Sequence, residues 1–171
     1  MSFLDDIKKN VKRLSQSKMN ARDAVQGSMG DAYVTIAGVR NHLGNMVKFE
    51  GKDSITEKKI GILGRPAKGT KMTNVDGTYT AVLYYNSSTM KEVVYIFRST
   101  GYMPEIEFYI ANDDPTSAAG RNSDVYRGCT IKEIITGQID VDADVLMQNI
   151  SGSYDEWEPV ERFRPIQGTA N

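Results

Sequence analysis

The sequence predicts a mainly β protein with one flanking α-helix and a helical extension at the N-terminus. Short runs rich in Val, Ile, Thr and Tyr recur between residues 31 and 155, as in strands, and one segment at residues 87–101 has helical periodicity. A separate amphipathic pattern covers the first residues of the chain. We therefore expect a helical extension at residues 1–26, followed by a β-sandwich or barrel with a polar C-terminal tail at residues 27–171.

Composition and charge fit an ordinary globular domain and exclude several classes of protein. The 171 residues are 40% hydrophobic and 25% charged, which suits one domain with a real core. A formal net charge of −1 argues against a protein that grips nucleic acid through bulk positive charge. No apolar run approaches the roughly 18 residues of a membrane helix, and the N-terminus lacks the apolar core of a secretory signal. We expect no membrane partner.

The extension is expected to contain an amphipathic helix at Phe3–Leu14. Ile7 and Val11 repeat at helical spacing between these two residues, and lysines and an arginine cover the other side. A polar stretch then separates this helix from the β-rich region. The helix could dock on a neighbouring copy of the chain or pack on its own domain, and the sequence leaves both alternatives open.

The β-rich region reads as a series of strands joined by glycine-containing and polar loops. The expected strands are 32–38, 45–52, 53–63, 77–85, 105–112 and a long stretch at 124–155, broken near Gly137 and at residues 151–153. Residues 113–123 have the composition of a loop, and residues 158–171, with two prolines, are expected to be extended or disordered.

The one clear helix within this region lies in residues 87–101. A capping box of Thr89 and Glu92 should begin it, and Gly101 supplies the left-handed cap at its end. Its core face is expected to consist of four apolar residues at i, i+3, i+4 and i+7: Met90, Val93, Val94 and Phe97. If Phe97 is buried against a sheet, its replacement by Ala should cost roughly 3–5 kcal/mol.

The stretch from Gly64 to Lys71 resembles a phosphate-binding P-loop, because two glycines four residues apart precede a Thr and a Lys. The resemblance fails on three counts. Pro66 lies inside the loop, the Thr and Lys are inverted, and a strand follows where the motif needs a helix whose N–H groups hold the phosphates. A long connection between two strands explains the same residues.

Three aspartates alternate with apolar residues in the segment "DVDADV". On a strand, Asp140, Asp142 and Asp144 would share one face. A calcium loop of the EF-hand type is excluded because its sixth and twelfth positions hold Val145 and Ser151. Two interpretations remain: a solvated face, or the wall of a negatively charged channel.

Catalysis finds little support in the sequence. His42 is the only histidine, and Cys129, the only cysteine, lies in an alternating strand where a core position is expected. Zinc sites built from Cys and His are excluded by number, and no serine lies in a nucleophile elbow. We expect no enzyme activity, no metal and no cofactor.

A nucleic-acid-binding β-barrel is the alternative that the residues themselves suggest. Basic residues beside aromatic ones can bind single strands, and the two groups here are Arg65, Lys68 and Lys71, and Tyr79, Tyr84 and Tyr85. The same tyrosines could instead be packing residues of a strand, with the cations decorating a loop.

The order of the glycine, threonine, aspartate and proline signals resembles a known family. The pattern runs from "GRPAKGTKMTNVDGTYTAVLYYNSS" through a helix, "GYMPEIEFYIANDDPTSAAGR" and "IDVDADV" to "YDEWEPVERF", and covers roughly Gly30–Phe163. It is similar to the tail tube proteins of contractile-tailed phages and phage-like particles, as in defective Bacillus-type prophage tails. The helical extension departs from the shorter N-termini of that family.

The resemblance implies a structural protein with a β-sandwich or barrel of the tail-tube type. Such proteins form hexameric rings that stack into a hollow tube inside a contractile sheath. The implied partners are further copies of the chain, the sheath protein, the tape-measure protein, and the baseplate or initiator and tail-terminator proteins. DNA passes through the lumen without specific binding. The implied location is the tail of a virion, assembled in the host cytoplasm. The tube of a contractile injection or secretion system is an alternative.

The resemblance also implies roles for two sets of residues. The first set is expected in a loop between rings or subunits: Gly64, Arg65, Lys68, Gly69, Lys71 and Asp76. The second set comprises candidate acids facing the lumen: Asp140, Asp142, Asp144, Glu105 and Glu107. Asp76–Gly77 is expected to mark the return of the loop into the strand 78–85. Replacing Gly64–Lys71 by a short turn should leave the monomer folded but abolish ring stacking.

Overall fold

The computed structural model describes residues 4–5 and 19–166, and these divide into two compact units. Unit 1 draws on the described residues within 1–31, 110–124 and 159–171, and unit 2 on Ala32–Tyr109 and Val125–Glu158. Apart from residues 4 and 5, the helix expected at residues 3–14 lies outside the described residues, so it stays a prediction.

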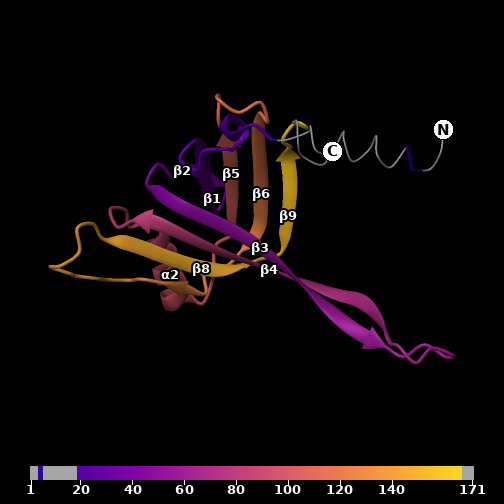
Figure 1. Ribbon diagram of the computed structural model, residues 1–171. Coiled ribbons are helices and arrows are strands. Elements are labelled where there is room, and N and C mark those ends of the chain that lie inside the picture. Colours follow the sequence, from indigo (N-terminus) through magenta and orange to yellow (C-terminus); the bar gives the residue numbers. More distant parts are fainter. Residues whose placement is uncertain (1–3, 6–18, 167–171) are drawn as a thin grey trace. The chain divides into compact units, whose positions relative to one another are not determined.

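The first sheet has five strands in the order β2-β1-β5-β6-β9 (Figure 1). Their bounds are β1 Gly30–Ile36, β2 Val39–His42, β5 Ile106–Asp113, β6 Arg121–Cys129 and β9 Glu156–Glu161. Residues 158–161 had been predicted to belong to an extended or disordered tail. They are extended, and they form the end of strand β9. Pro159 is tolerated there because β9 is an edge strand, where a missing N–H breaks no inner ladder.

The second sheet has four strands in the order β3-β4-β8-β7 and lies entirely in unit 2. Its strands are β3 Met46–Ile60, β4 Gly69–Tyr84, β7 Glu133–Ile134 and β8 Met147–Tyr154, and its pairings are antiparallel. Over residues 19–166, the mainly β fold with one α-helix is therefore confirmed. The expected long strands at 124–155 are wrong in detail, because residues 135–146 form a loop and residues 151–153 lie inside β8.

The core of unit 2 is built around aromatic rings from both sheets. Phe49 lies 5.3 Å from Phe108 and 5.8 Å from Tyr79, and Tyr79 lies 5.1 Å from Phe108, measured between ring centroids. The Tyr79 hydroxyl donates a 2.7 Å hydrogen bond to the Thr130 carbonyl. Burial raises the pKa of Tyr79, so the hydroxyl keeps its proton and remains a donor.

Within unit 1, the segment that precedes β1 is tied to the loop between β5 and β6. The Gln26 N–H donates to Asp114 Oδ2 at 2.9 Å, and the Ser117 hydroxyl donates to the Asp23 carbonyl at 2.7 Å. Hydrogen bonds from the Thr116 hydroxyl, the Gln26 N–H and the Thr116 N–H lower the pKa of Asp114. The Asp114 carboxylate thus stays charged and organises this attachment.

Helix α2, Thr89–Thr100, forms where the periodicity predicted it, but it is less buried than expected. Met90 and Val93 are buried, Val94 is half-buried and Phe97 is 46% exposed. The prediction of a buried Phe97 is therefore wrong: as far as the structure describes the chain, the buried side chains of α2 lie in its first two turns. Gly101 adopts the predicted left-handed conformation, with φ of 74°.

The predicted capping box at the start of α2 is also wrong. Ser88 is the N-cap residue and makes no side-chain cap hydrogen bond. Its carbonyl accepts the Glu92 N–H at 2.9 Å, while the Ser87 hydroxyl lies 3.1 Å from that of Thr89. The helix thus begins at Thr89, one residue earlier than a Thr89 N-cap would place it, and no capping box forms.

Candidate assembly surfaces

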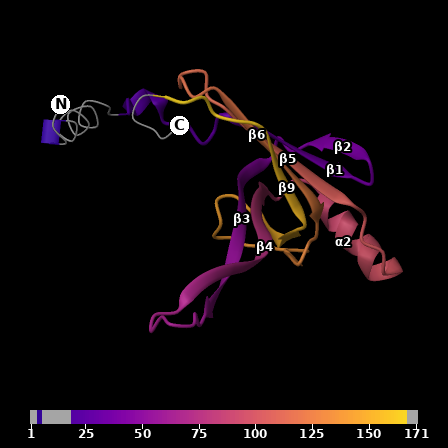
Figure 2. The same cartoon turned by 90° about the vertical axis from the view of Figure 1, so that its right-hand side faces the viewer.

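Strands β3 and β4 continue together well beyond the rest of their sheet. Strand β8 pairs with β4 only from Gly77 to Tyr84, whereas β3 pairs with β4 along its whole length to Ile60–Gly69. Figure 1 and Figure 2 both show this hairpin projecting beyond the other strands of unit 2. We call residues 54–76, beyond the last residue paired with β8, the arm.

One face of the arm carries a group of exposed apolar side chains. Cross-strand partners point to the same side of a ribbon, and residues two apart on a strand share a face. Ile55, Glu57 and Lys59 therefore share a face of β3, and a register shift after Thr56 brings Met72 opposite Glu57, as Val75 is opposite Ile55. Beside these two charges, this face carries three exposed apolar side chains, which we call the apolar face: Ile55, Met72 and Val75. The opposite face carries the pairs Ser54–Asp76, Thr56–Asn74 and Lys58–Lys71.

Two tyrosines hold the root of the arm. An ideal Cβ on Gly51 would lie 2.5 Å from the Tyr126 ring, and one on Gly77 would lie 2.5 Å from the Tyr154 ring. Each ring therefore covers a glycine in a strand interior. The Tyr154 hydroxyl donates to Asp53, and both burial and that carboxylate raise the pKa of Tyr154, so the donor keeps its proton. The sequence reading missed these residues, although glycines inside β-rich runs are a usable signal of close packing.

A Gly77→Ala variant tests this packing. The new methyl group should displace the Tyr154 ring and its hydrogen bond to Asp53, which we expect to cost about 1–3 kcal/mol of unfolding free energy. Gly61→Ala, on the same hairpin, is the matched control, because nothing lies within 4 Å of its Cβ position. Urea unfolding of both variants is the measurement. Equal stability of the two would show that the ring does not pack tightly on Gly77.

The residues predicted in an intersubunit loop lie on the arm, most of them near its end. Gly64 has φ of 80° and turns the chain, with Arg65 and Lys68 beside it, while Gly69 and Lys71 belong to β4. Asp76 had been expected to mark the return of the chain into a strand, and this expectation is wrong. β4 already begins at Gly69, so the expected long loop is mostly ribbon.

The three aspartates of "DVDADV" do not lie on a strand, which corrects the prediction that they share one strand face. They belong to residues 135–146, the connection between β7 and β8, which we call the acidic loop. The Asp142 N–H donates to Asp140 Oδ1 at 3.0 Å, a turn that a strand would not contain. Ile139 and Val141 are almost fully exposed in this loop. A position of the aspartates along a lumen stays a prediction.

The other two candidate acids lie at the beginning of β5. Glu105 is exposed and immediately precedes the strand, and its carbonyl accepts the Ala37 N–H at 3.0 Å. Glu107 lies 3.9 Å from the Arg127 guanidinium, which also forms a 2.7 Å contact with Glu158. Glu107 is therefore partly neutralised within the chain, and a lumenal role for either acid stays a prediction.

The basic and aromatic residues of the nucleic-acid alternative do not form one surface. Tyr79 is 1% exposed and belongs to the core. Lys71 lies eight residues earlier on the same strand, a separation of roughly 26 Å at the usual rise. Tyr79 therefore offers no stacking platform beside the cations of the arm.

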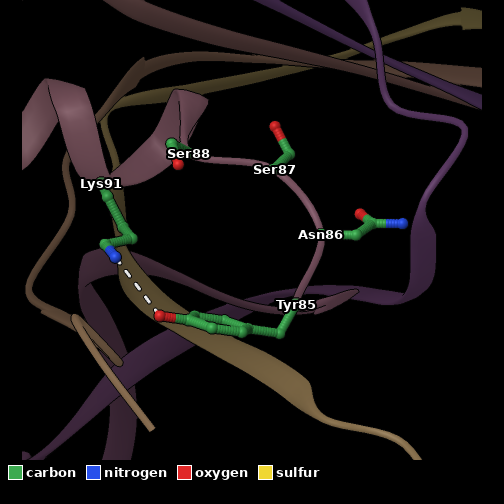
Figure 3. Close-up of a pocket in the computed structure, with 5 residues that line it drawn as sticks. All are labelled: Tyr85, Asn86, Ser87, Ser88 and Lys91. Carbon is green, nitrogen blue, oxygen red and sulfur yellow. Dashed lines mark hydrogen bonds between the residues drawn. The ribbon is translucent and has the colours of Figure 1, made fainter.

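A small pocket lies at the start of α2 and is lined by polar side chains (Figure 3). Its lining consists of Tyr85, Asn86, Ser87, Ser88 and Lys91. Lys91 Nζ donates to the Tyr85 hydroxyl at 3.2 Å. This lining contains no carboxylate, imidazole or thiol, so neither serine has a general base beside it within the pocket.

The two candidate reactive side chains lie in structural settings. Cys129 is 4% exposed, and burial raises the pKa of its thiol to about 12, as befits the predicted core residue. The His42 ring packs 4.9 Å from that of Tyr33. Across the described residues, no three His, Cys, Asp or Glu side chains are grouped so as to hold a metal ion, and no helix there is long and apolar enough to cross a membrane.

Comparison with known proteins gives a consistent result in sequence and in fold. The family model described as phage tail tube protein matches residues 17–161. The phage-like element PBSX protein XkdM of Bacillus subtilis (strain 168) is 19% identical over 145 residues, which are 85% of this chain and 96% of the relative.

Two solved structures share the fold. One is the sheath–tube complex of the extracellular contractile injection system PVC in its extended state, with a TM-score of 0.61 at 9% identity, covering 85% of this chain and 97% of the other. The other is the SPP1 tail tube, with a TM-score of 0.57 at 9% identity, covering 79% and 78%. Because the family model spans most of the sequence, the chain belongs to the phage tail tube protein family and is a structural, non-enzymatic tube subunit of a phage or phage-like particle tail.

Proposed function

We propose that the protein forms hexameric rings that stack into a hollow tube, with the arm reaching from each ring to the next. The observation that carries this proposal is the arm, whose apolar face is exposed within the chain. A ribbon with an exposed apolar face needs a partner, and in a homomeric tube that partner is another copy.

The edges of the sheets support the closure of each ring. β3 is an outer strand of the four-stranded sheet, and β2 and β9 are the outer strands of the five-stranded sheet. Outer strands present N–H and C=O groups that invite pairing with another chain. Joining such edges between subunits around a closed ring satisfies these groups without leaving a free end.

The proposed partners follow the architecture of similar particles. The similar PVC chain lies in a sheath–tube complex, and a similar chain occurs in the tube-terminating cap of the anti-feeding prophage. We infer that this tube lies inside a contractile sheath, between a baseplate or initiator and a terminator, and encloses a tape-measure protein before DNA passes through it. A tube in an injection system of the PVC type would use the same ring contacts.

Assembly of the purified protein tests the proposal. We expect long hollow tubes with six-fold rings in negative-stain electron micrographs, either from the protein alone or after co-expression with its initiator. Two-dimensional class averages of end views report the symmetry. A protein that stays monomeric at high concentration, also with baseplate components present, would contradict the proposal.

A further inference from the structure

Unit 2 has two exposed surfaces of opposite charge. The first is the end of the arm, residues 57–71, which we call the basic tip: it carries five cations, Lys58, Lys59, Arg65, Lys68 and Lys71, against a single acid, Glu57. The second is the acidic loop, residues 135–146, which carries Asp140, Asp142 and Asp144 and no basic residue. Their charges are complementary.

Apolar side chains accompany the charges on both surfaces. Leu63 is fully exposed on the basic tip, where Ile62 lies next to it. Ile139 and Val141 are almost fully exposed in the acidic loop. A single exposed apolar residue needs no explanation. Here, however, both surfaces combine apolar side chains with charged ones, and the charges are acidic in the loop and basic on the tip.

The acidic loop is held in place at its base by two glutamines. Gln148, itself 2% exposed, donates from Nε2 to the Ile135 carbonyl at 3.1 Å. Gln138 donates from Nε2 to the Met147 carbonyl. These bonds close the loop at both of its ends, so it presents its aspartates on a fixed base.

One copy cannot bring these two surfaces together. The basic tip lies at the Gly69 end of β4, whereas the acidic loop leads into Met147, which pairs with Tyr84 at the other end of β4. A strand of this length spans roughly 50 Å. Figure 1 shows the tip of the β3–β4 hairpin and the β7–β8 loop extending from opposite ends of unit 2. Complementary surfaces at opposite ends generate head-to-tail contacts, which propagate along an axis.

We propose that the basic tip of one copy docks on the acidic loop of a second copy in the next ring. This inference rests on the proposed stacking of rings and names the surface that receives the arm. Under this proposal, the three aspartates contact a neighbouring subunit and do not line the lumen. Charge complementarity between the surfaces sets the register of stacking and excludes wrongly rotated rings.

Charge reversal tests the pairing directly. The tip variant is Lys68→Glu with Lys71→Glu, the loop variant is Asp140→Lys with Asp142→Lys, and a third chain carries all four changes. The matched control reverses two exposed cations elsewhere, Arg98→Glu with Lys132→Glu. Circular dichroism confirms that each chain folds, and sedimentation with electron microscopy measures the fraction assembled into tubes.

We expect each two-residue reversal to lower the assembled fraction on the order of tenfold, while the control and the fourfold variant assemble like the wild type. Restoration in the fourfold variant is the decisive result, because the same contact is rebuilt with its charges exchanged. Normal tubes from either reversed variant, or no restoration in the fourfold variant, would overturn the pairing while the stacked tube stands. Absence of tubes from the wild type would instead overturn the proposed function.

Discussion

Replacing residues 57–73 by Asn-Gly is expected to give a folded protein that forms no tubes. The change joins Thr56 to Asn74, which face each other across the ribbon, through the two-residue turn that suits such a pair. The removed residues are exposed except Gly69, and Gly69 packs on Ile62, which is removed with it. The core of unit 2 therefore loses no contact, whereas the arm loses Met72 of its apolar face, Leu63 and all five cations of the basic tip.

Folding and assembly of the shortened chain can be measured separately. Its thermal midpoint should remain within a few degrees of the wild type, because shortening a surface connection changes the free energy of unfolding little. Electron microscopy should show rings or monomers in place of tubes. Tubes of wild-type length and repeat would show that the arm makes no contact between rings.

Phe108→Ala should be among the most destabilising single truncations in unit 2. Phe108 is 1% exposed, and its ring packs on those of Phe49 and Tyr79. Removing it leaves a cavity between the two sheets, so we expect a loss of about 3–5 kcal/mol. For a chain of this size, that corresponds to a fall of roughly 10 °C in the melting temperature.

Phe97→Ala is the matched control for this truncation. The same atoms are removed, but Phe97 is 46% exposed on α2, so its loss should cost much less than that of Phe108. Chemical denaturation of both variants, under conditions in which the protein is not assembled, gives the comparison. An equal loss in the two variants would mean that α2 is packed more tightly than its exposure indicates.

Local patterns predicted the elements well where burial and periodicity coincide. The alternation of Ile106 and Phe108 predicted β5, and the spacing of Met90 and Val93 predicted α2, because both patterns record one buried face. The capping of α2 was mispredicted. A Thr and a Glu at the right spacing form a capping box only if the chain enters the helix at that Thr, and it enters one residue earlier.

The proposed assembly surfaces were harder to predict, because a side chain that is exposed within its own chain leaves no buried face in the sequence pattern. Ile55 fell in an expected strand, but Met72 and Val75 fell in the expected long loop, and no local pattern showed that the three residues share an exposed face. The same limit made "DVDADV" look like a strand, since alternation there does not reflect a buried face. Alternating patterns identify a strand only when one side of it meets a core.

The continuity of β4 has a consequence for the energetics of tube growth. A single strand runs from the arm, at Met72, into the core, at Tyr79, so we expect the arm to behave as a rigid extension of a folded sheet. A flexible segment would lose conformational entropy each time that a ring is added. An arm already ordered in the free subunit avoids that loss, so more of its contact energy remains to drive elongation. The same rigidity would transmit bending of the tube directly to the subunit core, which favours a stiff tube.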